Sequence, residues 1–197
     1  MWKLFIKSIV ITVAFVLVGC ETLPEKQSAT QSVMPSGAKA TYTRAISAVK
    51  AGQDKKAIQL FTGLTQDYPD FAASFTNLGL LYLKQEKLAE AEHAFNQAII
   101  LNPVDAVAYN HLGIVLRQRG QFVQARKAYE KALDINSGYA SAHLNLGILN
   151  DLYLQDLSTA LQHYQRYQVL TGDSDKQVAK WIVDLERQVK TSGGKQG

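Results

Sequence analysis

The sequence repeats itself at an interval of 34 residues from residue 40 onward. A leucine–glycine pair recurs at Leu78-Gly79, Leu112-Gly113 and Leu146-Gly147. The same interval separates the alanines and the aromatic residues of two further sets: Ala57, Ala91 and Ala125, and Phe61, Phe95 and Tyr129. A fixed interval of this length indicates a stack of similar supersecondary units. It strongly constrains the fold, because each such unit buries its apolar face only against its neighbours.

Each unit carries two helical patterns in succession. Between residues 72 and 103, the first pattern places apolar or small residues at steps of three and four: Phe75, Leu78, Gly79 and Tyr82. Polar residues 85–87 interrupt it, and a second pattern follows with Leu88, Ala91, Ala94, Phe95 and Ala98 before Pro103. The unit is therefore predicted to be a helix–turn–helix pair in which the small residues Gly79 and Ala91 allow the two helices to approach closely.

This unit resembles the tetratricopeptide repeat, whose signature is an aromatic residue, Leu-Gly, Tyr, Ala, Phe, Ala and Pro at set places in 34 residues. The matching residues here are Phe75, Leu78-Gly79, Tyr82, Ala91, Phe95, Ala98 and Pro103. The resemblance implies an all-α fold: a helix–turn–helix solenoid of about four repeats, in residues 40–173, followed by a capping helix.

The other units depart from the signature in particular places. The third has Tyr109, Leu116 and Ala132 in phase but Ser137 where Pro is expected. The first is degenerate, with Ala45 in the Gly place and Ala48 in the Tyr place. The fourth contains one extra residue between 151 and 156, because Ala160 and Tyr164 lie one step late.

The last segments are predicted from their apolar spacing and composition. Residues 174–190 are expected to form the capping helix, with an apolar face of Val178, Trp181, Ile182, Leu185 and Val189. Residues 191–197 are polar and glycine-rich, and we expect them to be a disordered tail.

The amino-terminal segment has the pattern of a secretory signal peptide, with Lys3 and Lys7 before a short apolar run. It ends in Leu17, Val18, Gly19 and Cys20, which resemble the bacterial lipobox. The resemblance implies that residues 1–19 are removed and that Cys20 carries a diacylglyceryl group and an N-acyl chain such as palmitate. Residues 20–39 are then a flexible tether. Residue 21 is Glu rather than the Asp that commonly retains lipoproteins in the inner membrane, which favours lipid anchoring at the periplasmic face of the outer membrane.

In the family, the first helix of each pair lines a concave groove that binds an extended peptide or a helix of another protein. Carried over to this sequence, the groove candidates are Tyr42, Ile46, Lys50, Thr76, Leu80, Leu83, Lys84, Asn110, Ile114, Arg117, Leu144, Ile148 and Asp151. An aliphatic strip edged by Lys50, Lys84 and Arg117 suits a partly apolar peptide that carries an acidic residue or a free carboxylate. The alternative is that these apolar residues only pack on neighbouring repeats and that the charges are solvated.

The sequence offers little for catalysis, and we predict that the protein is not an enzyme. The four histidines, His93, His111, His143 and His163, are expected to lie in different repeats with no metal-ligand spacing, and His143 occupies an aromatic core place. Cys20 is the only cysteine, so no internal disulfide forms. No cofactor, metal or small-molecule substrate is predicted beyond the covalent lipid.

The charge balance argues against nucleic acid as a partner. Removing residues 1–19, with Lys3 and Lys7, reduces Lys+Arg from 21 to 19 against 17 Asp+Glu, so the net charge falls from +4 to +2. The chain also has no dense basic run.

Three functions remain open from the sequence. The first is an assembly factor, similar to type IV pilus biogenesis lipoproteins, that brings a secretin or pilus protein into place. The second is an adaptor that docks cell-wall hydrolases. The third is a structural subunit of an envelope complex, with Trp181 of the cap as a contact.

Overall fold

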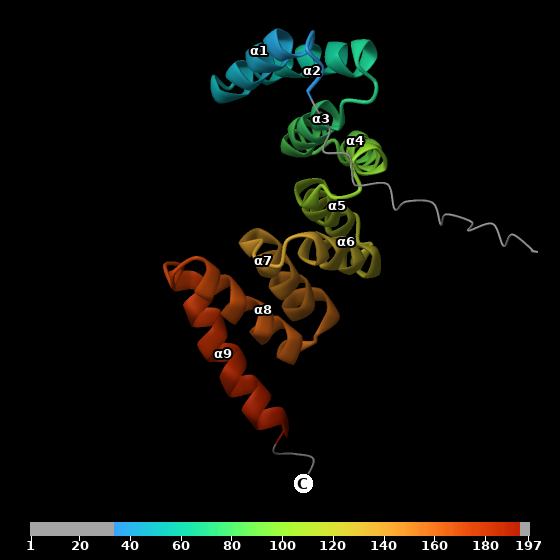
Figure 1. Ribbon diagram of the computed structural model, residues 1–197. Coiled ribbons are helices and arrows are strands. Elements are labelled where there is room, and N and C mark those ends of the chain that lie inside the picture. The colour runs from blue at the N-terminus through green and yellow to red at the C-terminus, as the bar shows by residue number, and fades with distance from the viewer. Residues whose placement is uncertain (1–33, 194–197) are drawn as a thin grey trace, which may run out of the picture.

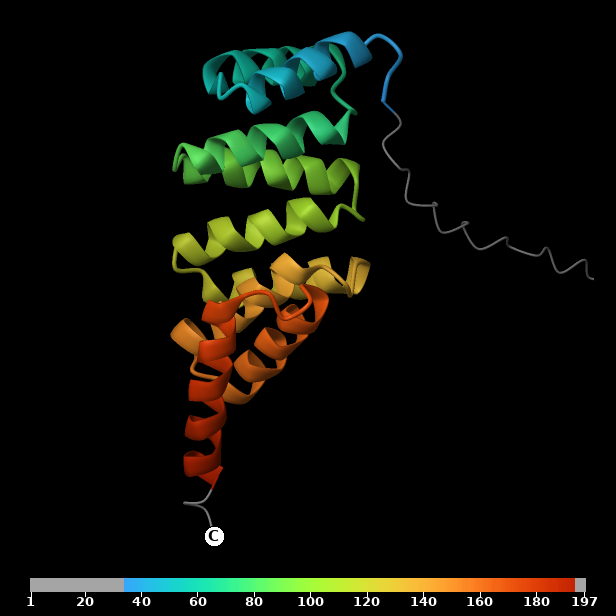
Figure 2. The same cartoon turned by 90° about the vertical axis from the view of Figure 1, so that its left-hand side faces the viewer.

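The computed structural model describes residues 34–193, and these form helices only, with no strand among them. The helices form successive pairs, and each pair stacks on the one before it (Figures 1 and 2). The elements are α1 (Lys39–Lys50), α2 (Asp54–Asp67), α3 (Ala72–Lys84), α4 (Leu88–Leu101), α5 (Ala106–Gln118), α6 (Phe122–Ile135), α7 (Ala140–Leu149), the π-helix η1 (Asn150–Leu154), α8 (Leu157–Leu170) and α9 (Lys176–Gly193). The predicted all-α repeat solenoid with about four pairs and a terminal helix is confirmed.

A glycine against an aromatic ring sets the distance between the two helices of three pairs. A Cβ atom added at Gly79, Gly113 or Gly147 would lie 2.6, 2.5 or 2.4 Å from the ring of Phe95, Tyr129 or Tyr164, respectively. Real Cβ contacts are essentially never that short. The repeated Leu-Gly pair is therefore a packing requirement, since only a residue without a side chain lets the ring lie on the helix backbone.

The core follows the stack as three clusters of buried residues. Each second helix contributes a fully buried ring from the same repeat position, namely Phe61, Phe95, Tyr129 and Tyr164. Each first helix packs on the second helix of its own pair and, from α3 on, on the second helix of the pair before it. The stability of the stack therefore comes from contacts within each helix pair and from contacts between successive pairs, as expected for a repeat protein.

The extra residue of the fourth unit is accommodated by a π-helix. Residues Asn150–Leu154 widen the end of α7 into η1, and Gln155 then takes a left-handed backbone conformation with φ 56°. The backbone N–H of Asp156 donates to the carbonyl of Asn150 at 2.9 Å, and the Asp156 side chain caps α8 by accepting from Thr159 N–H. A π-helix absorbs one inserted residue without breaking the helix, so α8 returns to the repeat packing.

The last helix covers the end of the stack. Val178 and Leu185 of α9 are buried, and the ring of Trp181 lies 5.4 Å from that of Tyr164 on α8. The helix runs to Gly193, past the predicted end at residue 190, and α1 already begins at Lys39. Within residues 34–193, none of the helices is of a length and apolarity that would cross a membrane.

Candidate functional site

One surface is formed by the first helices of the four pairs, and we call it the first-helix face. Four aliphatic residues, one from each of α1, α3, α5 and α7, recur along it at 34-residue steps: Ile46, Leu80, Ile114 and Ile148. All four are half-buried, so each leaves part of its apolar side chain in contact with solvent. Because Asn77 of α3 bonds to Tyr42 of α1, α3 contacts α5, and α5 contacts α7, these residues follow one another along one aliphatic strip.

The residues of the strip pack against the buried core of the stack. Ile46 packs against the buried cluster around Phe61, and Leu80, Leu83 and Ile114 pack against the cluster around Phe95 and Tyr129. Leu144 and Ile148 pack against the cluster that includes Tyr164 and the α9 residues Val178 and Leu185. Residues of the terminal helix α9 therefore belong to the same apolar cluster as two groove candidates of the fourth repeat.

Two of the predicted groove residues are buried between first helices and are not available to a ligand. Thr76 is 8 % exposed, and its hydroxyl donates to Asp105 Oδ2 at 2.8 Å, while Asp105 Oδ1 caps α5 by accepting from Ala108 N–H at 3.0 Å. Asn110 is 1 % exposed, and its Oδ1 accepts from Asn145 Nδ2 at 3.0 Å. Their groove assignment was wrong because this position on the first helix is directed at the neighbouring repeat.

Tyr42 also has a packing role. Its ring meets Phe61 and Phe71 edge-on at centroid distances of 5.7 and 5.3 Å. Its hydroxyl accepts from Asn77 Nδ2 at 3.2 Å, which links α1 to α3. The aromatic body of Tyr42 is therefore engaged between the first two repeats.

Of the basic residues predicted to edge the groove, one already has a carboxylate partner within residues 34–193. Lys84 forms an ion pair with Asp54 of α2 at 2.7 Å. Lys50 is exposed and forms no ion pair with the part of the chain that the structure describes. Asp151 is half-buried in η1 and accepts from the Tyr164 hydroxyl at 3.3 Å. Lys50 and Arg117 thus remain as the cations of this face that have no carboxylate partner.

Arg117 has an unusual setting at the end of α5. Its Nη1 lies 3.4 Å from the Tyr153 hydroxyl, and the guanidinium lies over the Tyr153 ring at 5.8 Å from the centroid. Tyr153 comes from the π-helix and packs in turn on Phe122 at 4.6 Å. Burial works to lower the pKa of Arg117, and the neighbouring Tyr129 and Tyr153 more than offset this.

The Arg117 guanidinium is half-buried and lacks a counter-ion. Of the arginines in residues 34–193 that have no carboxylate partner, Arg44 and Arg166 are exposed, whereas Arg117 is not. Its Nε and the hydroxyl of Tyr129 are both buried, and the neighbouring Tyr129 hydroxyl helps to raise the pKa of Arg117. A partly desolvated cation of this kind is stabilised by an incoming carboxylate more than a solvated one would be.

Sequence reasoning missed the contact between two histidines. His143 on α7 and His163 on α8 lie in the same repeat, not in different ones, and their Nδ1 atoms are 2.9 Å apart. His143 Nε2 lies 3.1 Å from the Ser137 carbonyl, which accepts its proton and leaves His143 Nδ1 free to accept from His163. The ring centroids are 5.2 Å apart and the ring planes are inclined by 39°. His143 is thus half-buried rather than part of the core.

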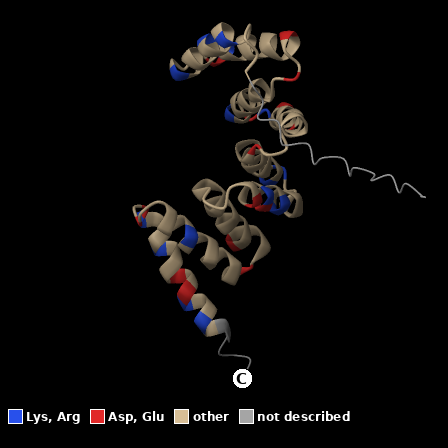
Figure 3. Cartoon of the chain, in the orientation of Figure 1, with Lys and Arg blue, Asp and Glu red and all other residues tan. Residues whose placement is uncertain are grey.

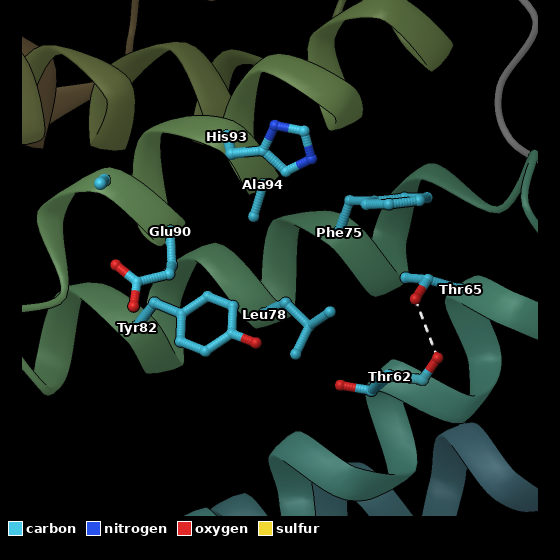
Figure 4. A pocket seen from close by; sticks show the side chains of 9 residues that line it. Thr62, Thr65, Phe75, Leu78, Tyr82, Glu90, His93 and Ala94 are labelled. Atoms are coloured by element: carbon cyan, nitrogen blue, oxygen red, sulfur yellow. Dashed lines mark hydrogen bonds between the residues drawn. The ribbon is translucent and has the colours of Figure 1, made fainter.

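The structure also contains a pocket of about 450 Å³ away from the first-helix face. It lies between α2 and α4, over α3, and Figure 4 shows Phe75, Leu78 and Tyr82 of α3 with Glu90 and His93 of α4. The signal in the sequence that could have indicated it is Ala89 and Glu90, whose equivalents one repeat later are Val123 and Gln124.

The lipidation residues Leu17, Val18, Gly19 and Cys20 lie outside the described residues. Within residues 34–193, no group of three or more His, Cys, Asp or Glu side chains is placed to hold a metal ion. Acidic and basic residues mix along α6 and α9 in Figure 3 rather than forming a stretch of one sign.

Comparisons with known proteins agree with the repeat architecture. A family model described as tetratricopeptide repeat matches residues 42–106, 76–140 and 112–175. A search of curated proteins finds no match.

Several solved structures share the fold. A MamA chain from Desulfovibrio magneticus RS-1 is 23% identical, with 71% of this chain and 78% of that chain covered and a TM-score of 0.62. Another MamA crystal structure is 17% identical, with 78% and 88% covered and a TM-score of 0.65. The first such repeat domain of Spaghetti (RPAP3), bound to the HSP90 peptide SRMEEVD, is 20% identical, with 60% and 93% covered and a TM-score of 0.57. At these identities the likeness concerns the fold.

Proposed function

This chain belongs to the tetratricopeptide repeat family, and we propose that it is a lipid-anchored periplasmic scaffold that holds a protein partner on its first-helix face. The observation that carries the proposal is the strip of Ile46, Leu80, Ile114 and Ile148, half-buried and in register along four repeats. An extended or helical segment can lay apolar side chains on such a strip, because the strip follows the stack over its length. The peptide held by the Spaghetti (RPAP3) domain is an example of the fold in this role.

The partner segment is partly apolar and carries a carboxylate. Among residues 34–193, Lys50 at one end of the strip and Arg117 further along are the cations of the face that have no carboxylate partner. Arg117 is the stronger anchor of the two, because its planar guanidinium is already held by Tyr153 and gives up little freedom when it binds. An acidic side chain or a free carboxyl terminus of the partner would supply the missing counter-ion.

The scaffold role is tested by crosslinking the protein in intact cells and identifying its partner. Leu80→Asp and Ile114→Asp place a charge on the strip, and we expect either to abolish crosslinking. Val123→Asp is the matched control, since Val123 is 52 % exposed on the second helix α6 and is not on the strip. Circular dichroism checks that all three variants remain folded. A partner retained by both strip variants would overturn the assignment of the first-helix face.

The membrane anchor rests on the sequence alone. Cys20 is proposed to carry diacylglyceryl and N-acyl groups, and Glu21 in place of Asp supports the outer membrane as the destination. Stable attachment requires more than one acyl chain, because a single chain gives only marginal membrane binding. The tether between Cys20 and α1 would let the repeat stack work at some distance from the membrane surface.

The pathway is proposed to be assembly of an outer-membrane or pilus complex, with a secretin or a pilus protein as the partner. Docking of cell-wall hydrolases is the second candidate, and it uses the same face. A structural subunit of an envelope complex is the third, and it is distinguished by contacts through the α9 cap. A partner that is lost on Trp181→Ala but retained on Leu80→Asp would favour the third candidate.

A further inference from the structure

The pocket between α2 and α4 lies on the opposite side of α3 from the first-helix face. Phe75, Leu78 and Tyr82 line the pocket, whereas Leu80 and Lys84 belong to the first-helix face. Residues two positions apart on a helix are directed about 200° apart, so Leu78 and Leu80 serve opposite surfaces. The pocket is therefore separate from the site of the proposed function, and its volume of about 450 Å³ is within the range of small-ligand pockets.

The pocket joins an apolar floor to a carboxylate. Its floor is made by the rings of Phe75 and Tyr82 and by Leu78, and Ala94 closes it from α4. Glu90 lines the same pocket and is exposed (Figure 4). Glu92 on the same helix pairs with Arg119, whereas Glu90 forms no ion pair within residues 34–193.

The other repeats show that this pocket is particular to one place in the stack. One repeat later, Val123 takes the position of Ala89 and Gln124 that of Glu90, so the wall becomes bulkier and the charge is absent. One repeat further, His143 takes the position of Phe75 and His163, after the inserted residue, that of Ala94. Those two imidazoles meet each other at 2.9 Å. The combination of small wall residues and a carboxylate thus occurs once in the described chain.

We propose that this pocket receives a lysine side chain of a protein partner. The aliphatic stem of a lysine would lie on Leu78 and the Tyr82 ring, and its ammonium would reach the Glu90 carboxylate. Aromatic faces attract the ammonium as well, which adds to the charge pairing. A lysine suits the site because its flexible aliphatic stem can follow the apolar floor and ends in a compact charge that reaches Glu90.

The test is an NMR titration of the isotope-labelled full chain in detergent, with three probes. The first is N-acetyl-lysine N-methylamide, the second is the norleucine analogue with the same stem and no charge, and the third is free n-hexylammonium. We expect the lysine probe to shift the backbone amides of residues 62–65, 75–82 and 89–94, and to bind about five- to tenfold more tightly than the norleucine probe.

Two variants reproduce residues that the next repeat already carries at the same positions. Glu90→Gln matches Gln124, and we expect it to remove the preference for lysine over norleucine while both probes still bind. Ala89→Val matches Val123, and we expect it to weaken both probes by narrowing the wall. Lys50→Gln, on the first-helix face, should leave both titrations unchanged, so failure of the proposed function and failure of this site are separable.

Three results would overturn the proposal. Equal binding of the lysine and norleucine probes to the unmodified protein would show that Glu90 does not select a cation. An unchanged lysine preference in Glu90→Gln would show that another group provides the charge. Glu90-dependent binding of n-hexylammonium without binding of the lysine probe would assign the pocket to a free organic amine instead of a partner's side chain.

Discussion

Replacing Gly113 by alanine tests whether the ring–glycine contact sets the geometry of the stack. The new Cβ would lie 2.5, 2.6 and 2.9 Å from Cε1, Cδ1 and Cζ of Tyr129. Tyr129 is fully buried, so its ring has no free space into which it can move. The helices α5 and α6 must therefore separate, or the ring must leave its preferred rotamer.

The expected change is a small difference between two opposing effects. Overpacking of a well-packed core costs about 1–3 kcal/mol. Alanine in place of glycine within a helix contributes about 0.5–1 kcal/mol in the other direction. We expect Gly113→Ala to lower the free energy of unfolding by about 1–2 kcal/mol, which corresponds to a decrease in Tm of about 2–8 °C for a chain of this size.

Gly63 on α2 provides the control, because nothing lies within 4 Å of a Cβ built there. Gly63→Ala should raise the free energy of unfolding by about 0.5–1 kcal/mol, opposite in sign to Gly113→Ala. Both are measured by urea denaturation followed by circular dichroism. The double variant Gly113→Ala/Tyr129→Leu should lose less stability than the sum of the single variants, since the smaller side chain relieves the clash. A stabilised Gly113→Ala would refute the packing argument.

Three further predictions concern other parts of the chain. Burial lowers the pKa of both His143 and His163, the latter to about 4. The unfolded chain therefore binds more protons below its ordinary histidine pKa of about 6.5, so stability is complete above that pH and declines toward pH 4. Because both rings are partly solvated, we expect a loss of about 1–2 kcal/mol. His163→Gln should reduce this loss in pH-dependent melting, because the contribution of His163 is removed while that of His143 remains. Asp105→Ala removes the cap of α5 and the acceptor of Thr76, and should cost about 1–2 kcal/mol in urea denaturation. Cys20→Ser should leave an uncleaved precursor in the inner membrane, and normal processing on a gel would contradict lipidation.

The repeat fold could be predicted from the sequence because its signals are redundant. The contact between Gly79 and Phe95 recurs as Gly113 with Tyr129, and each recurrence carries the same packing constraint. Even the extra residue in the fourth unit is visible, since the aromatic partner of Gly147 is displaced by one place to Tyr164. The sequence does not show how the extra residue is accommodated, because a π-helix and a longer turn absorb the same single insertion.

The site could be predicted only in part. The family resemblance indicates which residues of each first helix share one side, and it predicts Ile46, Leu80, Ile114 and Ile148 as groove candidates. It does not indicate how far the next repeat covers that side. Thr76 and Asn110 were therefore assigned to the groove although their polar groups bond to α5 and α7. The ion pair between Lys84 and Asp54 could not be predicted for the same reason, because it joins two neighbouring repeats.

Differences between repeats are more informative about function than the shared pattern is. Residues that recur from repeat to repeat, such as the Leu-Gly pair of the second, third and fourth repeats, are explained by packing. Glu90 and Ala89 have no such explanation, because the next repeat forms the corresponding helix with Gln124 and Val123 at those positions. The same holds for Arg117, whose repeat equivalent Leu83 packs as an ordinary apolar residue. Charges that one repeat carries and its neighbour lacks can serve the stack, as Asp105 does by capping α5, but Glu90 and Arg117 have no charged partner among the described residues, so we attribute them to a partner protein. By this argument the opposite sides of the solenoid bind groups of opposite charge, a carboxylate at Arg117 and an ammonium at Glu90. One partner could bind at both sites only if it wrapped around the edge of the stack.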